Sequence, residues 1–290
     1  MTDQIRVCID RHLTPAQARV ALRARRVSLA ALNDKIWPNG QVIRATFLGG
    51  DLSVRNKVVA YAKQWEQHAN IRFDFTQASD AQLRIAFDVG GSWSYIGTDA
   101  LVIPRHEPTM NYGWLTPSTN DAEYSRVVLH EFGHALGCFH EQQHPETGIP
   151  WDREAVYAYY AGHPNFWSRE EVDVNIFATY SRDITRFSAY DPTSIMHYPI
   201  PNELTLGDFE VGWNTVLSPT DQQYAGILYP RPAPPPIDRA EAMRTAAHTA
   251  VDPFLALVRT HPDMAAGWDQ LTGAEYVRDA VEAAYQRGAA

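Results

Sequence analysis

The stretch that decides the fold reads Ser125-Arg-Val-Val-Leu-His130-Glu131-Phe-Gly-His134-Ala-Leu-Gly137-Cys-Phe-His140-Glu141. His130 and His134 are four residues apart, so on a helix they are separated by about 400° and share one face, where two imidazole nitrogens can bind one ion. Glu131 lies about 100° around the helix, beside such an ion rather than on it. The spacing therefore predicts a helix that carries a metal site with a carboxylate next to it.

The third histidine needs a different backbone. His140 follows His134 by six residues, which on a continuing helix is a rotation of about 600° and points its ring away. Gly137 can adopt the left-handed conformation that ends a helix, because it has no Cβ. We expect the helix to end there and His140 to return as a third ligand. Three nitrogens that leave a fourth position for water are the catalytic form of a zinc site, so one catalytic Zn²⁺ is expected.

These residues resemble a known family. The stretch is similar to the zinc-binding signature of the metzincins, and Glu141 after the third histidine resembles its astacin version. Further on, Tyr190-Asp-Pro-Thr-Ser-Ile-Met196-His-Tyr198 resembles the Met-turn of astacins. The resemblance implies that Met196 lies beneath the zinc ligands and that Tyr198 is a further metal ligand. Residues 85–87, 91–97 and 217–221 also resemble the astacin catalytic domain, so the likeness covers about residues 41–230.

The apolar pattern gives the fold class. Alternation at 43–47, 71–75 and 83–87 predicts three half-buried strands, and a stripe from Val54 to Trp65 predicts a helix between the first two. With the resemblance, this indicates an α+β, metzincin-like domain with a twisted, mostly parallel sheet, a backing helix and the active-site helix. Thr109–Leu115 resembles the edge strand to which metzincin substrates add as an antiparallel strand, with an ordinary loop as the alternative.

The ends of the chain differ in composition from its middle. Five prolines between 230 and 236 predict a stiff connector, and helical spacing beyond them predicts a small helical appendage. We therefore divide the chain into an N-terminal extension (1–40), an astacin-like catalytic domain (41–230), a Pro-rich linker (231–237) and a helical tail (238–290).

Charge and composition exclude several classes of partner. The chain has 34 acidic and 25 basic residues, and its net charge of −9 opposes binding to a phosphate backbone. It has neither a long apolar run nor a start typical of a signal peptide. We expect no nucleic acid or membrane partner, a protein or peptide substrate, and a cytoplasmic location or export by a non-classical route. The sequence sets no oligomeric state.

The two cysteines, Cys8 and Cys138, are too few for a disulfide framework. A Cys8 thiolate is a candidate latency switch on zinc. Its surroundings match the matrixin switch poorly, however, so we expect a small buried hydrophobic residue.

Three other polar residues lie near the motifs. By the family resemblance Glu141 contacts a trimmed N-terminus, and a solvated or salt-bridged carboxylate is the alternative. We expect His144 at the surface and His197 in a supporting hydrogen bond rather than on the metal.

The combined pattern predicts a zinc-dependent metalloendopeptidase. Bound Zn²⁺ lowers the pKa of its water to about 7. Glu131 is the expected general base, and Tyr198 is the expected donor to the oxyanion. A matrixin- or serralysin-like peptidase is disfavoured by Tyr198 and by the lack of calcium repeats. A non-catalytic, zinc-stabilised binding module is disfavoured by Glu131, which such a module does not need.

Overall fold

The computed structural model describes residues 6–9, 11–25, 35–76, 78–180 and 189–232. The chain divides into one compact unit, Met1–Arg231, and a second unit, Pro232–Ala290. The helical tail expected at 238–290 lies outside the described residues. Among the residues described, no helix is both long and apolar enough to cross a bilayer.

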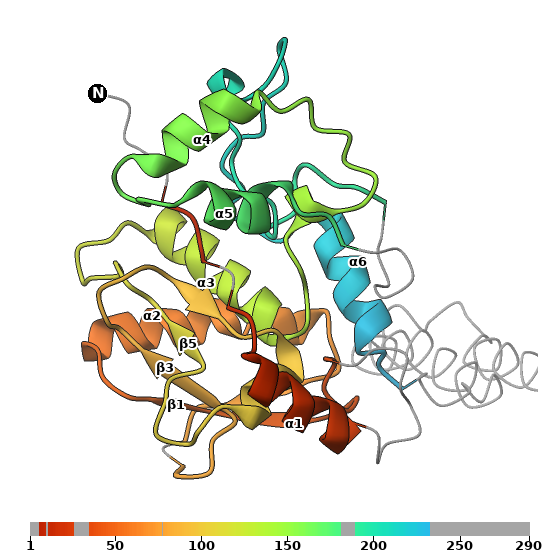
Figure 1. Cartoon of the computed structure of the whole chain (residues 1–290). Coiled ribbons are helices and arrows are strands. Elements are labelled where there is room, and N and C mark those ends of the chain that lie inside the picture. The colour runs from red at the N-terminus through yellow and green to blue at the C-terminus, as the bar shows by residue number, and fades with distance from the viewer. Residues whose placement is uncertain (1–5, 10, 26–34, 77, 181–188, 233–290) are drawn as a thin grey trace, which may run out of the picture. The chain divides into compact units, whose positions relative to one another are not determined.

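Within the described residues, a five-stranded sheet in the order β2-β1-β3-β5-β4 forms one half of the first unit (Figure 1). β1 pairs in parallel with β2 and β3, β3 pairs in parallel with β5, and β4 pairs antiparallel with β5. The sheet is thus mostly parallel, as predicted. The strands are β1 (Val42–Phe47), β2 (Arg72–Asp74), β3 (Leu83–Ala86), β4 (Trp93–Ser94) and β5 (Met110–Asn111).

Two details of the strand predictions are wrong. Thr109–Leu115 was expected at the edge, but its strand, β5, lies between β3 and β4, so the edge strand on this side is β4. β3 was expected to be half-buried, yet all four of its residues are buried. The alternating pattern predicts that Arg84 faces solvent. Instead the chain between β3 and β5 covers this face of the strand, and the Arg84 guanidinium donates to the carbonyls of Ile103 and Glu107 in that connection.

The helices of the described residues are α1 (Pro15–Arg25), α2 (Leu52–Ala62), α3 (Asp121–Ala135), α4 (Arg153–Ala161), α5 (Arg169–Val172) and α6 (Pro219–Leu228). Helix α2 is the predicted backing helix, and Asp51 caps its start by accepting a hydrogen bond from the Ser53 backbone N–H. α3 is the predicted active-site helix. Both pack on the sheet (Figure 1), so the apolar stripe of each helix meets the buried strands.

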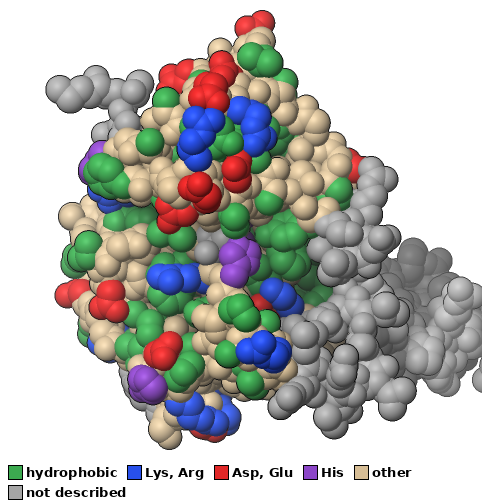
Figure 2. Space-filling view, in the orientation of Figure 1, with side chains coloured by type: hydrophobic (Ala, Val, Ile, Leu, Met, Phe, Trp, Pro, Cys, Tyr) green, Lys and Arg blue, Asp and Glu red, His purple; other side chains and the backbone are tan. Residues whose placement is uncertain are grey.

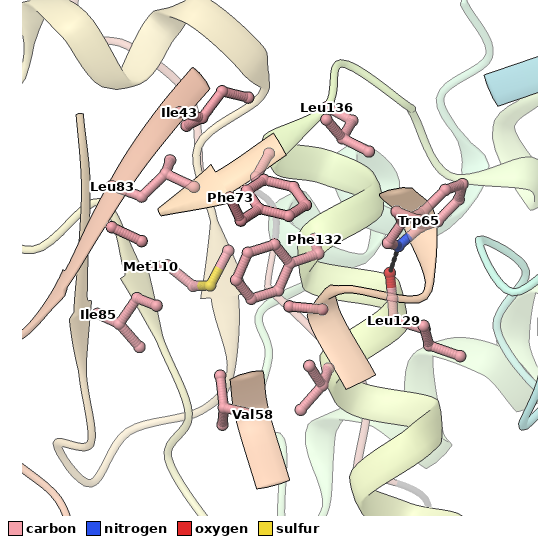
Figure 3. Close-up of a cluster of buried hydrophobic side chains, with 14 of the residues drawn as sticks. Ile43, Val58, Trp65, Phe73, Leu83, Ile85, Met110, Leu129, Phe132 and Leu136 are labelled. Carbon is pink, nitrogen blue, oxygen red and sulfur yellow. Dashed lines mark hydrogen bonds between the residues drawn. The ribbon is translucent and has the colours of Figure 1, made fainter. Parts of the chain in front are cut away.

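The main core lies between α3, α2 and the sheet (Figure 3). Phe73 of β2 meets Phe132 of α3 edge to face, with ring centroids 4.9 Å apart. The Trp65 indole donates to the Leu129 carbonyl oxygen at 3.0 Å. Trp37, which falls in the predicted extension, is buried in the same core and donates to the Ala135 carbonyl. These contacts fix α3 along its length against the sheet.

A second hydrophobic cluster holds the other half of the unit, which contains α4 and α5. The N-terminal segment, described at residues 6–9 and 11, runs between the two halves (Figure 1), and Val7 is buried in this second cluster. On the face shown in Figure 2, acidic and basic side chains alternate over α4 and α5, where Arg153 pairs with Asp173 and Arg169 with Glu154.

The end of α3 follows the prediction. Its last residue is Ala135, and Gly137 has φ of 102°, the left-handed conformation that only glycine adopts without strain. A second glycine, Gly133, faces the turn that contains Met196. A Cβ at residue 133 would lie far inside contact distance of the Met196 sulfur and within 3.2 Å of the Trp65 ring. The close approach of that turn to α3 therefore requires glycine at 133.

We predict that Gly133→Ala destabilises the chain by about 1–3 kcal/mol, because an added methyl overpacks this contact. The measurement is urea unfolding of the zinc-loaded full chain. Gly212→Ala is the matched control, since a Cβ at 212 meets nothing within 4 Å. An equal change in the two variants would contradict the tight packing of this turn on α3.

Candidate active site

Three imidazoles converge beside the C-terminal half of α3. Nε2 of His140 lies 3.0 Å from Nε2 of His134 and 3.2 Å from Nε2 of His130. All three side chains are buried. The turn at Gly137 brings His140 back to the two helical histidines, which is the arrangement that the spacing predicts.

The outer nitrogens of two rings fix how these rings point. Nδ1 of His130 donates to the Ile195 carbonyl oxygen, and Nδ1 of His134 donates to the Cys138 carbonyl oxygen, each at 2.8 Å. Because a carbonyl only accepts, the proton of each neutral ring is on Nδ1 and the lone pair on Nε2 faces the centre. Burial, with the neighbouring His134 and His140 rings, holds the pKa of His130 well below its usual range. His130 is therefore neutral at pH 7, as a metal ligand must be.

This donor set fits zinc. Tetrahedral Zn²⁺ with Zn–N bonds of about 2.0–2.1 Å holds its nitrogen ligands about 3.3 Å apart. This is close to the separations of His140 Nε2 from Nε2 of His134 and of His130. Buried lone pairs that face one another repel unless a cation lies between them. The hydrogen bonds from Nδ1 to carbonyls are the outer contacts that metal-bound histidines commonly make.

Cys8 completes the cluster and corrects the sequence expectation. Its Sγ lies 3.2 Å from Nε2 of His140 and 3.5 Å from Nε2 of His134. The four ligand atoms lie within 4.8 Å of one another. A Zn–S bond of about 2.3 Å gives a sulfur-to-nitrogen separation of about 3.5 Å in a tetrahedral site. Cys8 is buried as expected, but against the metal ligands rather than as a packing residue.

The segment around Cys8 lies along the sheet edge. The Ile9 backbone N–H donates to the Ser92 carbonyl at 3.0 Å, and Arg11 forms a parallel bridge with Tyr95, just after β4. On the opposite side the Tyr198 hydroxyl donates to the Cys8 carbonyl at 2.6 Å. The segment therefore crosses the site beside β4 and runs parallel to it.

Glu131 and Tyr198 are both buried, and their roles in the reaction, with Tyr198 as a metal ligand, stay predictions. Glu131 is fully buried on α3, one residue after His130. The Tyr198 ring centroid is 4.4 Å from that of His140, and its hydroxyl is 3.7 Å from Sγ of Cys8.

The Met-turn is held by a residue whose role the sequence did not reveal. The carboxylate of Asp221, on α6, accepts hydrogen bonds from the Ser194 hydroxyl and the Ile195 backbone N–H, at 2.7 and 2.8 Å. Ile195 in turn accepts from His130, so α6 fixes a ligand's orientation through two hydrogen bonds. The sequence shows that Ser218 and Asp221 can form a capping box at the start of α6, but it does not show that Asp221 also binds the turn at Ser194 and Ile195.

The remaining polar residues differ in outcome. The contact of Glu141 with a trimmed N-terminus stays a prediction. Among the described residues Glu141 forms no surface ion pair: its carboxylate accepts from the Asp191 backbone N–H at 2.8 Å, and burial raises its pKa to about 7. His144 is buried, so its prediction as a surface residue is wrong. His197 shares a hydrogen bond of 2.9 Å with the Tyr190 hydroxyl and makes another with the Tyr198 carbonyl.

The chain is similar to known proteins in sequence and in fold. Among curated proteins, the zinc metalloproteinase nas-38 of Caenorhabditis elegans is 30% identical over 145 residues, which are 50% of this chain and 17% of the relative. Blastula protease 10 of Paracentrotus lividus is 27% identical over 205 residues, 65% of this chain and 30% of the relative. The chain thus matches less than a third of the length of either protein.

A solved structure of myroilysin is 54% identical, with a TM-score of 0.68, and the match covers 70% of this chain and 98% of the other. The model of the Astacin peptidase family matches residues 30–203, which is more than half of the chain and includes the three histidines. The chain therefore belongs to the astacin family of zinc metallopeptidases.

Proposed function

We propose that this chain is an endopeptidase that cleaves extended polypeptides at the His130, His134 and His140 site, and that its N-terminal segment holds it latent. The observation that carries the proposal is the convergence of three Nε2 atoms, together with the fully buried carboxylate of Glu131 on the helix that carries His130 and His134. A structural metal site has no use for that carboxylate.

The chain's own residues divide the work of peptide hydrolysis. When bound, zinc activates a water and polarises the substrate carbonyl. Glu131 takes a proton from the attacking water and passes it to the departing amine. The Tyr198 hydroxyl donates a hydrogen bond to the carbonyl oxygen as negative charge develops there. The Ile195 carbonyl holds the His130 ring in place while this happens, and Met196 packs on α3 at Gly133, between His130 and His134 in the sequence.

The N-terminal segment makes the chain latent because it occupies a ligand position at the metal site and the hydroxyl of Tyr198. Three histidines and Cys8 make four ligands, the number of a closed zinc site, so no position is left for water. The Cys8 carbonyl also takes the hydrogen bond of Tyr198 that the oxyanion would need. Substrate hydrolysis then requires that the segment leave both places.

An extended chain is the substrate that this site suits, since β4 offers an unpaired edge once the segment leaves. We also propose that the chain binds neither nucleic acid nor membranes. Its domains would end at residues 40, 230 and 237, and it would be cytoplasmic or exported by a non-classical route.

We predict that Glu131→Gln lowers kcat/KM for an unfolded protein by about 10²–10⁴-fold while one zinc per chain is retained, because only the proton carrier is lost. The test uses zinc-loaded chain cut between residues 25 and 35, with metal measured by mass spectrometry. Exposed Glu203→Gln is the control. Wild type that holds zinc but cleaves nothing would instead support a binding module.

We predict that Tyr198→Phe lowers kcat by about 10²–10³-fold in the cut enzyme, the usual cost of one oxyanion donor, with little change in KM. Steady-state kinetics on one peptide check this. A kcat within twofold of wild type would remove Tyr198 from the reaction.

We predict that Cys8→Ala raises the activity of the intact chain at least tenfold, because the fourth ligand is lost. After cutting and removal of the released segment, variant and wild type should be equally active. Cys138→Ala, which changes the other buried cysteine, serves as control. Intact Cys8→Ala as inactive as intact wild type would contradict latency through the thiol.

A further inference from the structure

Arg126 lies one turn before His130 on the active-site helix and has no part in the chemistry above. Residues 126, 130 and 134 are spaced by four, so they share one face of α3. Arg126 is only 9% exposed. One of its Nη2 hydrogens points at the N-terminal segment, where the Arg6 carbonyl oxygen accepts it at 3.1 Å.

The guanidinium is held rigidly before anything binds. Its Nε and Nη2 form a two-point contact with the Glu123 carboxylate, at 2.8 and 2.7 Å. Glu123 also accepts from the Trp114 indole at 2.7 Å. The ring of Trp213 lies 4.6 Å from the guanidinium carbon. Nη2 therefore keeps a second hydrogen free of Glu123 and aimed at the chain that lies across the site.

The spacing relates this donor to the reacting centre. Four residues of helix rise about 6 Å, and two residues of extended chain span about 6.6 Å. Arg6 is two residues from Cys8, whose Sγ lies with the metal ligands. A polypeptide that places its scissile bond at the metal thus places a carbonyl about two residues away at Arg126.

The direction of the segment shows on which side of the scissile bond the substrate carbonyl at Arg126 lies. The segment runs parallel to β4, with residue 11 toward Tyr95 and residue 6 toward Arg126. A substrate added antiparallel to β4 runs the opposite way, so its C-terminal part lies toward Arg126.

We propose that Arg126 binds a backbone carbonyl of the substrate about two residues C-terminal to the scissile bond, the place that Arg6 fills in the intact chain. This proposal rests on the proposed peptidase function. Arg126 is a substrate-positioning residue, held by Glu123, and it favours substrates that extend well beyond the cleaved bond.

The test uses three peptides with one scissile bond: a short reference, the reference extended by three residues at its C-terminus, and the reference extended by three at its N-terminus. The zinc-loaded full chain is cut between residues 25 and 35 before assay. For wild type, the C-terminal extension should raise kcat/KM. Arg126→Met should lower the ratio of kcat/KM between the C-terminally extended and reference peptides about tenfold, mainly through KM.

Two variants guard the interpretation. Arg126→Lys keeps a cationic donor and should recover part of the ratio. Arg169→Met is the matched control, because Arg169 is held in the same way as Arg126. It contacts the Glu154 carboxylate at two points and lies 3.7 Å from the centre of the Tyr157 ring. It should leave the ratio unchanged. A ratio within one enzyme is unaffected by loss of folded protein.

Binding is measured separately with the Glu131→Gln chain, cut and zinc-loaded, and a fluorescent C-terminally extended peptide. Adding Arg126→Met should raise Kd about tenfold. The proposal would be overturned if Arg126→Met changed neither the kcat/KM ratio of the C-terminally extended and reference peptides nor the Kd. It would also be overturned if Arg126→Met lowered kcat/KM only for the N-terminally extended peptide. Absence of cleavage by wild type would refute the peptidase function, while the Kd comparison would still decide the role of Arg126.

Discussion

The constraint on which the rest of the structure depends is the convergence of three buried imidazoles, with Nε2 of His140 3.0 Å from that of His134 and 3.2 Å from that of His130. A cation bound among them satisfies all of their lone pairs at once, and the backbone must hold the three rings together for it. The left-handed Gly137 turns the chain back, and the carbonyls of Cys138 and Ile195 set two rings. Packing of α3 on the sheet supplies the rigid base for this geometry.

The N-terminal segment uses the groups that substrate hydrolysis needs. It takes the edge of β4, the hydroxyl of Tyr198, the guanidinium of Arg126 and a place among the metal ligands. Val7 adds burial in the cluster of α4 and α5. In the function that we propose, inhibition and catalysis are two uses of one surface, and they differ in the direction of the bound chain, because the segment runs parallel to β4.

Much of the site was predictable because its signal is local. The spacing of His130, His134, Gly137 and His140 sits within eleven residues, and the period of apolar residues predicts β1, α2, β2 and β3 in the right order. Cys8 was misjudged because its partners are 126 and 132 residues away, and no local pattern connects them. The edge strand was misplaced because β4 has only two residues. His144 is buried next to Tyr190, 46 residues further along the chain, and the contacts of Arg126 with Arg6 and of Asp221 with Ser194 also join distant segments.

The central claim is that one zinc binds where His130, His134 and His140 meet, with Cys8 as its fourth ligand in the intact chain. X-ray absorption spectroscopy of zinc in the purified intact chain measures this directly. The account predicts one zinc per chain with three nitrogen ligands at about 2.0–2.1 Å and one sulfur at about 2.3 Å. Less than one zinc per chain, or a first shell without sulfur, would contradict it.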